Sequence, residues 1–347
     1  MRVHAIADRF FDEGFIDLTL AGARAAGFAC SVGAWEHPSL AAYRTDVLLS
    51  ETDGPDSVRH PPDYAAMAGL AEAEMLVVQF CPVTAQVLEH APRLKYVGVN
   101  RVGVENVAVA ALREAGVRVV NVVGRNAQAV AEFSVGMLLA ELRDIARADE
   151  RMRRGEWVVD YPGASARREL RGSTVGIVGA GPVGLAAART LAGFDCRVLM
   201  HAPHDYAPPA HAAAVGFEEL LRESDFVMLH ARLVPGVNDR MLSEREFGMM
   251  KKGAVLVNTA RAGLVDEAAL VAALRSGQLG GAALDVFHEE PPAPGHGLQN
   301  LPNVTLTPHI AGVTREAWEN APRMMSEFIV KIAAGDLEQI PFLDEAS

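Results

Sequence analysis

The sequence is short of cysteine and of positive charge, and it has no long apolar run. Its three cysteines (Cys30, Cys81 and Cys196) are widely spaced without a C-x-x-C pattern, which indicates reduced thiols rather than a disulfide framework. No histidines stand at metal-ligand spacing, so we expect no metal site. A net charge of −12 argues against a nucleic-acid partner or an anionic membrane surface. No apolar run approaches the ~20 residues of a membrane span, and the first residues predict a strand rather than a signal peptide, so we expect a cytoplasmic protein.

The chain is organised around a short apolar run that leads into a glycine-rich turn. Residues 174–178 are rich in β-branched side chains and predict a buried parallel strand. The next six residues form a G-x-G-x-x-G pattern, and a helix-forming run follows. This order is typical of a dinucleotide-binding site, because free N–H groups and the positive end of the helix dipole face the phosphates. The predicted cofactor-binding residues are Gly179, Gly181, Pro182, Val183 and Gly184. The alternative is a simple glycine-rich turn.

Strands and helices alternate regularly along the chain. In the second half, strands are predicted at 174–178, 197–200, 225–230, 254–258 and 280–285, and helices near 182–192, 217–223, 243–248 and 266–275. This alternation predicts a doubly wound parallel sheet. In the first half, strands at 3–7, 75–80 and 94–99 and a helix at 12–26 predict a small parallel α/β domain that ends near residue 100. One long helix is expected from 126 or 127 to about 154, and a last helix, 315–334, is expected to return to the first domain.

The second strand of the predicted nucleotide-binding sheet ends without an acidic residue. An Asp or Glu there binds the ribose 2′-hydroxyl of NAD and repels the 2′-phosphate of NADP. This sequence has His201 and Ala202 at the strand end, and Asp205 lies slightly beyond. No arginine follows directly, so His201, His204 and Arg232 are the candidates for binding a 2′-phosphate. The alternative is a surface loop whose histidines have no role, and the sequence is compatible with NAD or NADP.

Three charged residues follow apolar strands in the second half of the chain: Arg261, Glu290 and His309. Ligands in open α/β sheets lie at the carboxyl ends of strands. A histidine supplies or retrieves a proton near neutral pH, a carboxylate on its other nitrogen orients it, and an arginine binds a carboxylate with two N–H groups. The set therefore suits the reduction of a carbonyl next to a carboxylate. Each could instead be a structural loop residue, and spacing alone leaves Glu289 as an alternative to Glu290.

Four motifs in order resemble the D-isomer-specific 2-hydroxyacid dehydrogenase family, which includes D-3-phosphoglycerate dehydrogenase and glyoxylate/hydroxypyruvate reductase. They lie at 175–184, 258–266, 284–291 and 307–312, within a resemblance that runs from about Leu94 to Lys331. The resemblance implies a Rossmann-type doubly wound parallel-sheet domain, 101–312, inserted into a smaller flavodoxin-like α/β substrate domain, 1–100 and 313–347. It also implies an active site in the cleft between the domains, a 2-hydroxy or 2-oxo acid as substrate, and a homodimer through the cofactor domains.

The resemblance also implies a role for each residue of the motifs. Arg261 binds substrate, Glu290 orients the histidine, and His309 is the acid/base; the family places its glutamate just before the proline, which favours Glu290 over Glu289. The further cofactor-binding residues in these motifs are Thr259, Asp285, which is expected to contact the nicotinamide carboxamide, and Gly312. His201 and Arg232 are added as cofactor-binding candidates at positions where the sequence departs from the family pattern. The implied substrate-binding residues are Arg101, Val102 and Gly103, together with Arg261.

This sequence departs from the family pattern at several positions. Arg101 stands where a glycine is common, which suggests a substrate with a second anionic or polyhydroxylated group, such as a sugar acid; the alternative is an arginine paired with a nearby glutamate. His230-Ala-Arg232 replaces the usual His-x-Pro, so Arg232 is a candidate for the adenine side or the 2′-position, and His230 is expected to be structural or to line the adenine side. Trp157 and Tyr161 follow the long helix and are expected to pack locally or to reach a neighbouring subunit.

Two other functions share parts of this pattern. Dinucleotide-sensing co-repressors have the same fold and can retain all three charged residues, so such a binding protein is the main alternative to an enzyme. Formate dehydrogenase fits poorly, because that branch pairs its histidine with a glutamine where Glu290 stands here. The chain ends soon after the last predicted helix, so we expect it to lack the regulatory domain found in many phosphoglycerate dehydrogenases.

Overall fold

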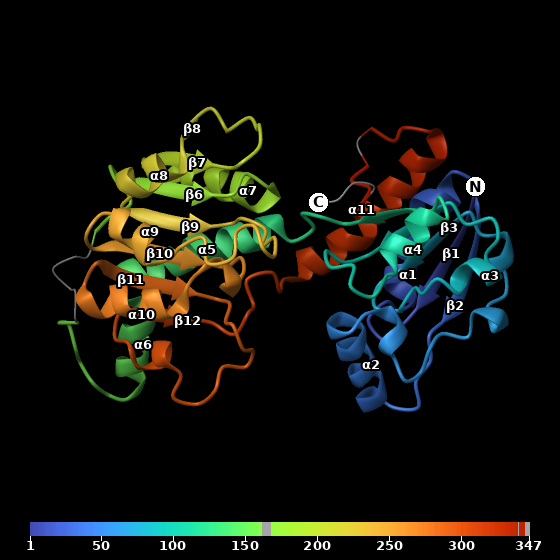
Figure 1. The fold of residues 1–347 in the computed structure, drawn as a ribbon, viewed down its shortest axis with the longest axis horizontal. Helices are drawn as coiled ribbons and strands as arrows, with labels where there is room; N and C mark the ends of the chain where they lie inside the picture. The colour runs from blue at the N-terminus through green and yellow to red at the C-terminus, as the bar shows by residue number, and fades with distance from the viewer. Residues whose placement is uncertain (162–167, 339, 344–347) are drawn as a thin grey trace. The chain divides into compact units, whose positions relative to one another are not determined.

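The chain folds into two compact units in the computed structural model shown in Figure 1. Unit one comprises Met1–Arg125 and Arg315–Ser347, and unit two comprises Asn126–Thr314. The structure describes residues 1–161, 168–338 and 340–343. No helix of this described part is both long enough and apolar enough to cross a membrane.

Unit one is built around a five-stranded parallel sheet with the strand order β2-β1-β3-β4-β5. Its strands are β1 (Arg2–Ala7), β2 (Ala29–Ala34), β3 (Met75–Val78), β4 (Tyr96–Val99) and β5 (Arg118–Asn121). Its helices are α1 (Glu13–Ala25), α2 (Leu40–Thr52), α3 (Val87–His90), α4 (Val109–Glu114) and α11 (Arg315–Ala334). One face of the sheet packs against α1 and α11, and the side chains of α2, α3 and α4 contribute to the core on the other face. The predicted return of the last helix to the first domain is confirmed.

Unit one extends farther along the chain than the sequence predicted. Its fifth strand, β5, pairs in parallel with β4, with Val97 opposite Val119. The stretch 101–125 therefore belongs to unit one, whereas we placed it in the 101–312 domain. Strand β5 forms its hydrogen bonds with β4. An apolar run in the sequence predicts a strand but does not show which other strand it pairs with. The second predicted segment of this domain, 313–347, includes residues 339 and 344–347, which lie outside the described residues.

Unit two contains a seven-stranded parallel sheet with the order β12-β11-β10-β9-β6-β7-β8, which is the predicted doubly wound arrangement. Its strands are β6 (Thr174–Val178), β7 (Arg197–His201), β8 (Ala212–Ala214), β9 (Phe226–Leu229), β10 (Ala254–Asn258), β11 (Leu279–Leu284) and β12 (Val304–Leu306). Its helices are α5 (Ala127–Leu142), α6 (Ile145–Arg153), α7 (Pro182–Leu191), α8 (Phe217–Glu223), α9 (Glu244–Met249) and α10 (Glu267–Ser276). The strand order reverses between β6 and β9, so the carboxyl ends of these two strands mark the expected ligand-binding edge.

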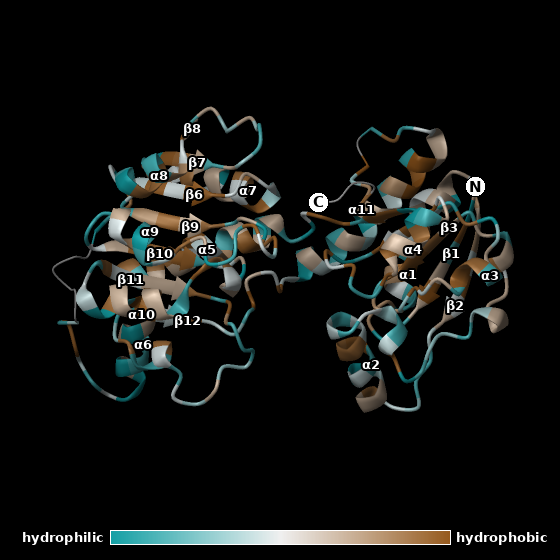
Figure 2. Ribbon diagram, viewed as in Figure 1, coloured by the Kyte–Doolittle hydropathy of each residue, from teal (hydrophilic) through white to brown (hydrophobic). Residues whose placement is uncertain are grey.

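Helices cover both faces of the second sheet. The core on one face includes side chains of α5 and α7, and the core on the other includes side chains of α8, α9 and α10. Figure 2 shows the strands of both sheets mostly in brown, with teal residues gathered on loops and outward helix faces. Strands that are buried on both faces read as continuous apolar runs, which is why most of them were found from the sequence.

The long helix predicted from 126 or 127 to about 154 is wrong, because it breaks into α5 and α6. Asp144 lies between the two helices with a left-handed φ of +54°. Arg147 donates hydrogen bonds to Asp144 at 3.0 Å and to Glu141 at 2.7 and 2.9 Å. These bonds stabilise the turn that separates the two helices. The short strand β8, and the pair β2 and α2, were also not predicted.

Candidate active site and cofactor site

The glycine-rich turn between β6 and α7 has different constraints at each of its three glycines. Gly179 has a φ of +111°, and a Cβ there would lie 2.5 Å from the backbone of His230. A Cβ on Gly184 would lie 2.0 Å from the carbonyl oxygen of Gly179. A Cβ on Gly181, in contrast, would meet no protein atom within 4 Å. The first and third glycines are therefore required by the packing of the protein itself, whereas the second borders open space of the kind that a pyrophosphate needs.

The first turn of α7 supplies the donors for an anion. The helix begins at Pro182, directly after Gly181, and no side chain caps it. The N–H groups of Val183 and Gly184 lie in the first turn, where a helix has no internal acceptors for them. Proline has no N–H group, but the helix loses no hydrogen bond at Pro182, because an N–H group at the first helical position has no partner within the helix. The residues predicted from the sequence thus form one helix N-terminus whose free donors and dipole fit a dinucleotide pyrophosphate.

The strand β7 ends beside this turn without a carboxylate. The N–H group of Gly179 donates to the carbonyl oxygen of His201 at 2.8 Å, so His201 is adjacent to the glycine turn. The Nδ1 atom of His201 lies 3.1 Å from the carbonyl oxygen of Val215, and its ring packs 5.5 Å from that of Phe217. His204 and Asp205 lie exposed in the loop that follows. The strand end therefore presents an imidazole where an acidic residue would discriminate against NADP.

His230 and Arg232 follow the neighbouring strand β9. The His230 side chain is buried, and burial lowers its pKa to about 4, so the ring is neutral. Neither of its ring nitrogens has a hydrogen bond to the described residues. The structural role expected for His230 agrees with this burial. The carbonyl oxygen of Arg232 accepts a hydrogen bond from Asn238 at 2.8 Å, and the contact of its guanidinium with a cofactor stays a prediction.

The loops after β11 and β12 bring His309 and Glu290 together. The Nδ1 atom of His309 lies 2.7 Å from the Oε2 atom of Glu290, while Oε1 accepts the N–H group of Phe287 at 3.0 Å. The side chain of His309 is 48% exposed, which leaves its Nε2 accessible. His309 also has a left-handed φ of +54°, a strained conformation that is more frequent at functional sites. Glu290, not Glu289, is therefore the partner of His309.

The charge state of Glu290 fits this pairing. Partial burial alone would raise its pKa, but the hydrogen bonds from His309 and Phe287 and the positive charges of His309 and Arg261 outweigh this effect. The pKa of Glu290 is consequently lowered, and the carboxylate is ionised at neutral pH. An ionised partner on Nδ1 holds the ring in one orientation and directs Nε2 outward, as a general acid/base requires.

Arg261 lies on the loop that follows β10, within electrostatic range of Glu290. Its side chain is exposed, and its Nη1 atom donates to the carbonyl oxygen of Ala260 at 2.8 Å. The buried side chain of Asn258 shapes this loop by accepting the N–H group of Ala260 at 3.0 Å and donating to the carbonyl oxygen of Arg261 at 3.0 Å. The guanidinium keeps its remaining donors for an anionic ligand. Thr259 is buried, and its hydroxyl has no hydrogen-bond partner among the described residues.

Asp285 organises the loop that carries His309. Its side chain is fully buried, and it accepts hydrogen bonds from the Thr307 hydroxyl at 2.6 Å and from the N–H groups of Ile310 at 3.0 Å and Ala311 at 2.8 Å. These bonds hold the residues on both sides of His309. Both carboxylate oxygens are used within the protein, so the observed role of Asp285 is to position this loop, and its contact with the nicotinamide carboxamide stays a prediction.

Two positioning residues were not singled out from the sequence. Asn258 and Thr307 fix the loops that carry Arg261 and His309, and both lie inside the motifs that were recognised. Their signal was a short polar side chain at the end of an apolar strand or directly after it, which is typical of residues that hydrogen-bond to a nearby turn.

The residues around Gly312 border a surface hollow. A Cβ on Gly312 would lie 2.5 Å from the Asn126 side chain, so this glycine is required by packing against the start of α5. A hollow of 410 Å³ lies next to it in unit two. It is lined by Ala129, Glu132, Phe133, Ile310, Ala311, Val313 and Thr314. Because Ile310 and Ala311 directly follow His309, this hollow adjoins the histidine loop. Contact of Gly312 with a cofactor stays a prediction.

The predicted substrate loop, Arg101–Gly103, belongs to unit one and follows β4. The Nη2 atom of Arg101 lies 2.5 Å from the Oε1 atom of Glu51, and its guanidinium stacks 4.7 Å from the Phe80 ring centre. The Arg101 side chain is 15% exposed. Asn121 donates a side-chain hydrogen bond to the carbonyl oxygen of Val102, which fixes the loop. Of the two expectations for Arg101, the structure therefore agrees with the pairing to a nearby glutamate, which is Glu51.

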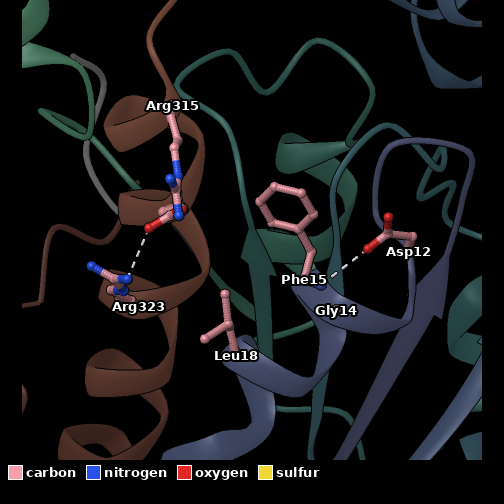
Figure 3. Close-up of a pocket in the computed structure, with 7 residues that line it drawn as sticks. Asp12, Gly14, Phe15, Leu18, Arg315 and Arg323 are labelled. Atoms are coloured by element: carbon pink, nitrogen blue, oxygen red, sulfur yellow. Dashed lines mark hydrogen bonds and ion pairs between the residues drawn. The ribbon is translucent and has the colours of Figure 1, made fainter.

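A second hollow, of 380 Å³, lies in unit one between α1 and α11 and is shown in Figure 3. Its lining residues are Asp12, Gly14, Phe15, Leu18, Arg315, Glu319 and Arg323. Arg315 and Arg323 both pair with Glu319, at 2.7 and 2.9 Å, and Asp12 caps α1. The charges of this hollow are thus satisfied within the protein, and none of the predicted site residues lines it.

Comparison with known proteins agrees with the geometry. Residues 135–311 match the model of the NAD-binding domain of D-isomer specific 2-hydroxyacid dehydrogenases. D-3-Phosphoglycerate dehydrogenase from Archaeoglobus fulgidus is 36% identical over 284 residues, which cover 80% of this chain and 51% of that protein. Glyoxylate reductase from Aeropyrum pernix is 36% identical over 288 residues, which cover 81% and 86%. A solved structure of an acyclic imino acid reductase with NADPH and D-Arg is 25% identical, with a TM-score of 0.70 over 98% and 99% of the two chains.

The extent of these matches decides what they show. The chain spans 43–55% of the length of four phosphoglycerate dehydrogenases that it matches. It spans most of the glyoxylate reductase, and the matched domain includes the glycine turn, Arg261, Glu290 and His309. Residues 135–311 are accordingly an NAD-binding domain, and the chain belongs to the D-isomer-specific 2-hydroxyacid dehydrogenase family.

Proposed function

We propose that the protein is an NAD(P)-dependent oxidoreductase that interconverts a D-2-hydroxy acid and its 2-oxo acid. The observation that carries this proposal is the 2.7 Å contact between His309 and an ionised Glu290. It lies in the same unit as the glycine turn and within electrostatic range of Arg261. A dinucleotide-sensing protein needs the glycine turn alone, whereas an oriented, accessible imidazole beside a guanidinium suits catalysis.

The proposed roles follow from the atoms that each side chain leaves available. Arg261 pairs with the substrate carboxylate through two N–H groups and polarises the neighbouring carbonyl. His309 donates its Nε2 proton to the carbonyl oxygen in reduction and accepts the hydroxyl proton in oxidation. Glu290 stays ionised and holds Nδ1 throughout. A bound nicotinamide cofactor supplies the hydride to the carbonyl carbon or accepts it in the reverse direction.

The substrate class follows partly from the loop at residues 101–103. We propose that backbone N–H groups of this loop bind the substrate carboxylate. Because Glu51 balances the charge of Arg101, a second anionic group on the substrate would have to displace this pairing. Sugar acids, which carry hydroxyl groups instead of a second charge, need no such displacement. We therefore propose 2-oxo acids in general, with sugar-derived acids as one group to test.

The missing acid at the end of β7 supports the use of either NAD or NADP. His201 closes this strand end, and His204 and Arg232 are the proposed additional contacts for a 2′-phosphate. We also propose a homodimer. Ile145, Met152 and Trp157, in and just after α6, are 55%, 54% and 83% exposed, which is unusual for apolar side chains that lack a partner surface. The other sequence-based prediction for Trp157, local packing, does not fit this exposure.

The proposal is tested by turnover of His309→Ala and Arg261→Lys. With a panel of 2-oxo acids and both reduced cofactors, the wild type should oxidise the cofactor, and His309→Ala should lose roughly 10²–10⁴-fold in kcat. Arg261→Lys should raise KM, because an ammonium group cannot reproduce the two-pronged pairing. Both variants should bind the cofactor as the wild type does. Cofactor binding without turnover of any acid by the wild type would instead support the co-repressor-like alternative.

A further inference from the structure

Three metal-ligating side chains converge in unit one at a place that the proposed activity does not use. His37 lies in the loop before α2, Asp46 lies in α2, and His60 lies in the loop after that helix. One ligand atom from each lies within 4.8 Å of the other two. No spacing in the sequence indicates this cluster, because its members are separated by turns of helix and loop rather than by a motif spacing.

The carboxylate of Asp46 is held in place at the centre of the cluster. Its side chain is fully buried, and its Oδ1 atom accepts the N–H group of Arg59 at 2.8 Å. Its Oδ2 atom lies 2.7 Å from the Nδ1 atom of His60 and 3.2 Å from the Nε2 atom of His37. The N–H group of His60 also donates to Oδ2, at 3.1 Å. Such backbone bonds to a carboxylate are typical of the outer contacts that orient a metal ligand.

His37 is a buried imidazole whose contact with Asp46, at 3.2 Å from Nε2, does not have hydrogen-bond geometry. Its side chain is 1% exposed, and its ring lies edge-on to Trp35 and Tyr43, with ring centres 4.3 and 5.2 Å away. Neither ring nitrogen makes a hydrogen bond of acceptable geometry to any residue that the structure describes. An unsatisfied buried polar group is costly, so an additional partner for His37 is favoured.

We propose that His37, Asp46 and His60 bind one divalent transition-metal ion of the zinc type. Two neutral imidazoles and one carboxylate are nitrogen and oxygen ligands that suit Zn²⁺. Bonds of ~2.0–2.1 Å in a tetrahedron place ligand atoms about 3.3 Å apart. The two separations from Asp46, 2.7 and 3.2 Å, need a small expansion, and the two histidine nitrogens lie within 4.8 Å of one another. The His60 side chain is 40% exposed, which leaves an entry path and a fourth position for water.

The ion would cross-link the loop after α2 to the rest of unit one. Besides the cluster, this loop is held by the indole N–H group of Trp35, which donates to the carbonyl oxygen of His60 at 2.8 Å. A metal that joins His60 to Asp46 and His37 would add a link from the loop to α2 and to the segment after β2. The proposed role is structural, and it is independent of the oxidoreductase activity.

The test uses the full chain after treatment with a chelator. Adding Co²⁺ should produce visible absorption that saturates at one equivalent, and Zn²⁺ should abolish it and raise the melting midpoint by at least about 2 °C. His60→Ala, at a partly exposed position, should fold and bind Co²⁺ at least tenfold more weakly. His90→Ala, a half-buried histidine of the same unit, is the matched control and should bind like the wild type.

Two results would overturn the proposal. If the wild type takes up no stoichiometric Co²⁺ or Zn²⁺, the cluster is a hydrogen-bonded group without an ion. If His60→Ala binds as tightly as the wild type, the ion lies elsewhere. Asp46→Asn provides a second variant, since it retains the side-chain volume and should also lose binding at least tenfold.

Discussion

Replacing Glu290 with glutamine tests the central contact of the proposed active site. The carboxylate uses both oxygens as acceptors, one for the N–H group of Phe287 at 3.0 Å and one for Nδ1 of His309 at 2.7 Å. Glutamine has one acceptor oxygen and one donor group. It must either give up the Phe287 bond or turn its NH₂ group toward Nδ1. The second arrangement prevents Nδ1 from carrying the proton that His309 needs when it acts as an acid through Nε2.

The magnitude follows from the two kinds of hydrogen bond. A bond to a charged group contributes about 1.5–3 kcal/mol and a neutral one about 0.5–1.5 kcal/mol. Losing the charge alone therefore costs about 1–2 kcal/mol, or roughly tenfold in rate. If the amide also turns toward Nδ1, the loss approaches the roughly 10²–10⁴-fold that general acid catalysis contributes. We expect kcat of Glu290→Gln to fall between about tenfold and 10³-fold.

The assay follows the absorbance of the reduced nicotinamide at saturating 2-oxo acid, and cofactor fluorescence measures binding separately. Glu289→Gln is the matched control, because it makes the same chemical change at the neighbouring exposed position. Cofactor affinity should be unchanged in both variants. A kcat of Glu290→Gln within twofold of the wild type, on a substrate that the wild type turns over, would refute the assignment of Glu290 as the positioning residue.

Two further predictions concern the glycine turn and a buried acid. Gly181→Ala should fold like the wild type but bind the cofactor at least tenfold more weakly. Gly184→Ala should instead lower the melting midpoint, because its Cβ would lie 2.0 Å from a carbonyl oxygen. Gly193→Ala, where the added Cβ meets open space, is the control, and equal behaviour of all three variants would contradict the assignment. Burial raises the pKa of Glu141 from 4.5 to about 7, so the folded state holds a proton that the unfolded state releases between these pH values. The free energy of unfolding of the wild type, measured relative to that of Glu141→Gln, should therefore fall by about 3 kcal/mol as the pH rises from 4.5 to above 7. Urea denaturation of both proteins at pH 5 and pH 8 measures this difference. The same pH dependence in both proteins would disprove the prediction.

The local features of this protein were predictable from its sequence. The strand, glycine turn and helix at 174–191 depend on neighbours along the chain, and so do the apolar strands β10 and β12, which precede Arg261 and His309. The last helix was predicted with its observed bounds, Arg315–Ala334, because apolar spacing along a helix is a local signal. Arg261 and His309 followed from their positions after strands, whereas the family resemblance favoured Glu290 over Glu289.

Partner selection, in contrast, was decided by contacts between distant parts of the chain. Strand β5 joins the first sheet because its hydrogen bonds go to β4, and Arg101 is neutralised by Glu51, which lies fifty residues earlier. The buried carboxylate of Asp285 likewise accepts the N–H groups of Ile310 and Ala311, which lie 25 and 26 positions later.

The sequence by itself determined the type of each unit and the chemistry at the ends of its strands, because apolar periodicity and turn residues act over a few positions. Only the tertiary structure decided which side chains share a site. It placed Glu290 rather than Glu289 on His309, and it gathered His37, Asp46 and His60 around one point. These outcomes depend on packing, which sets the separation of side chains that no spacing along the chain encodes.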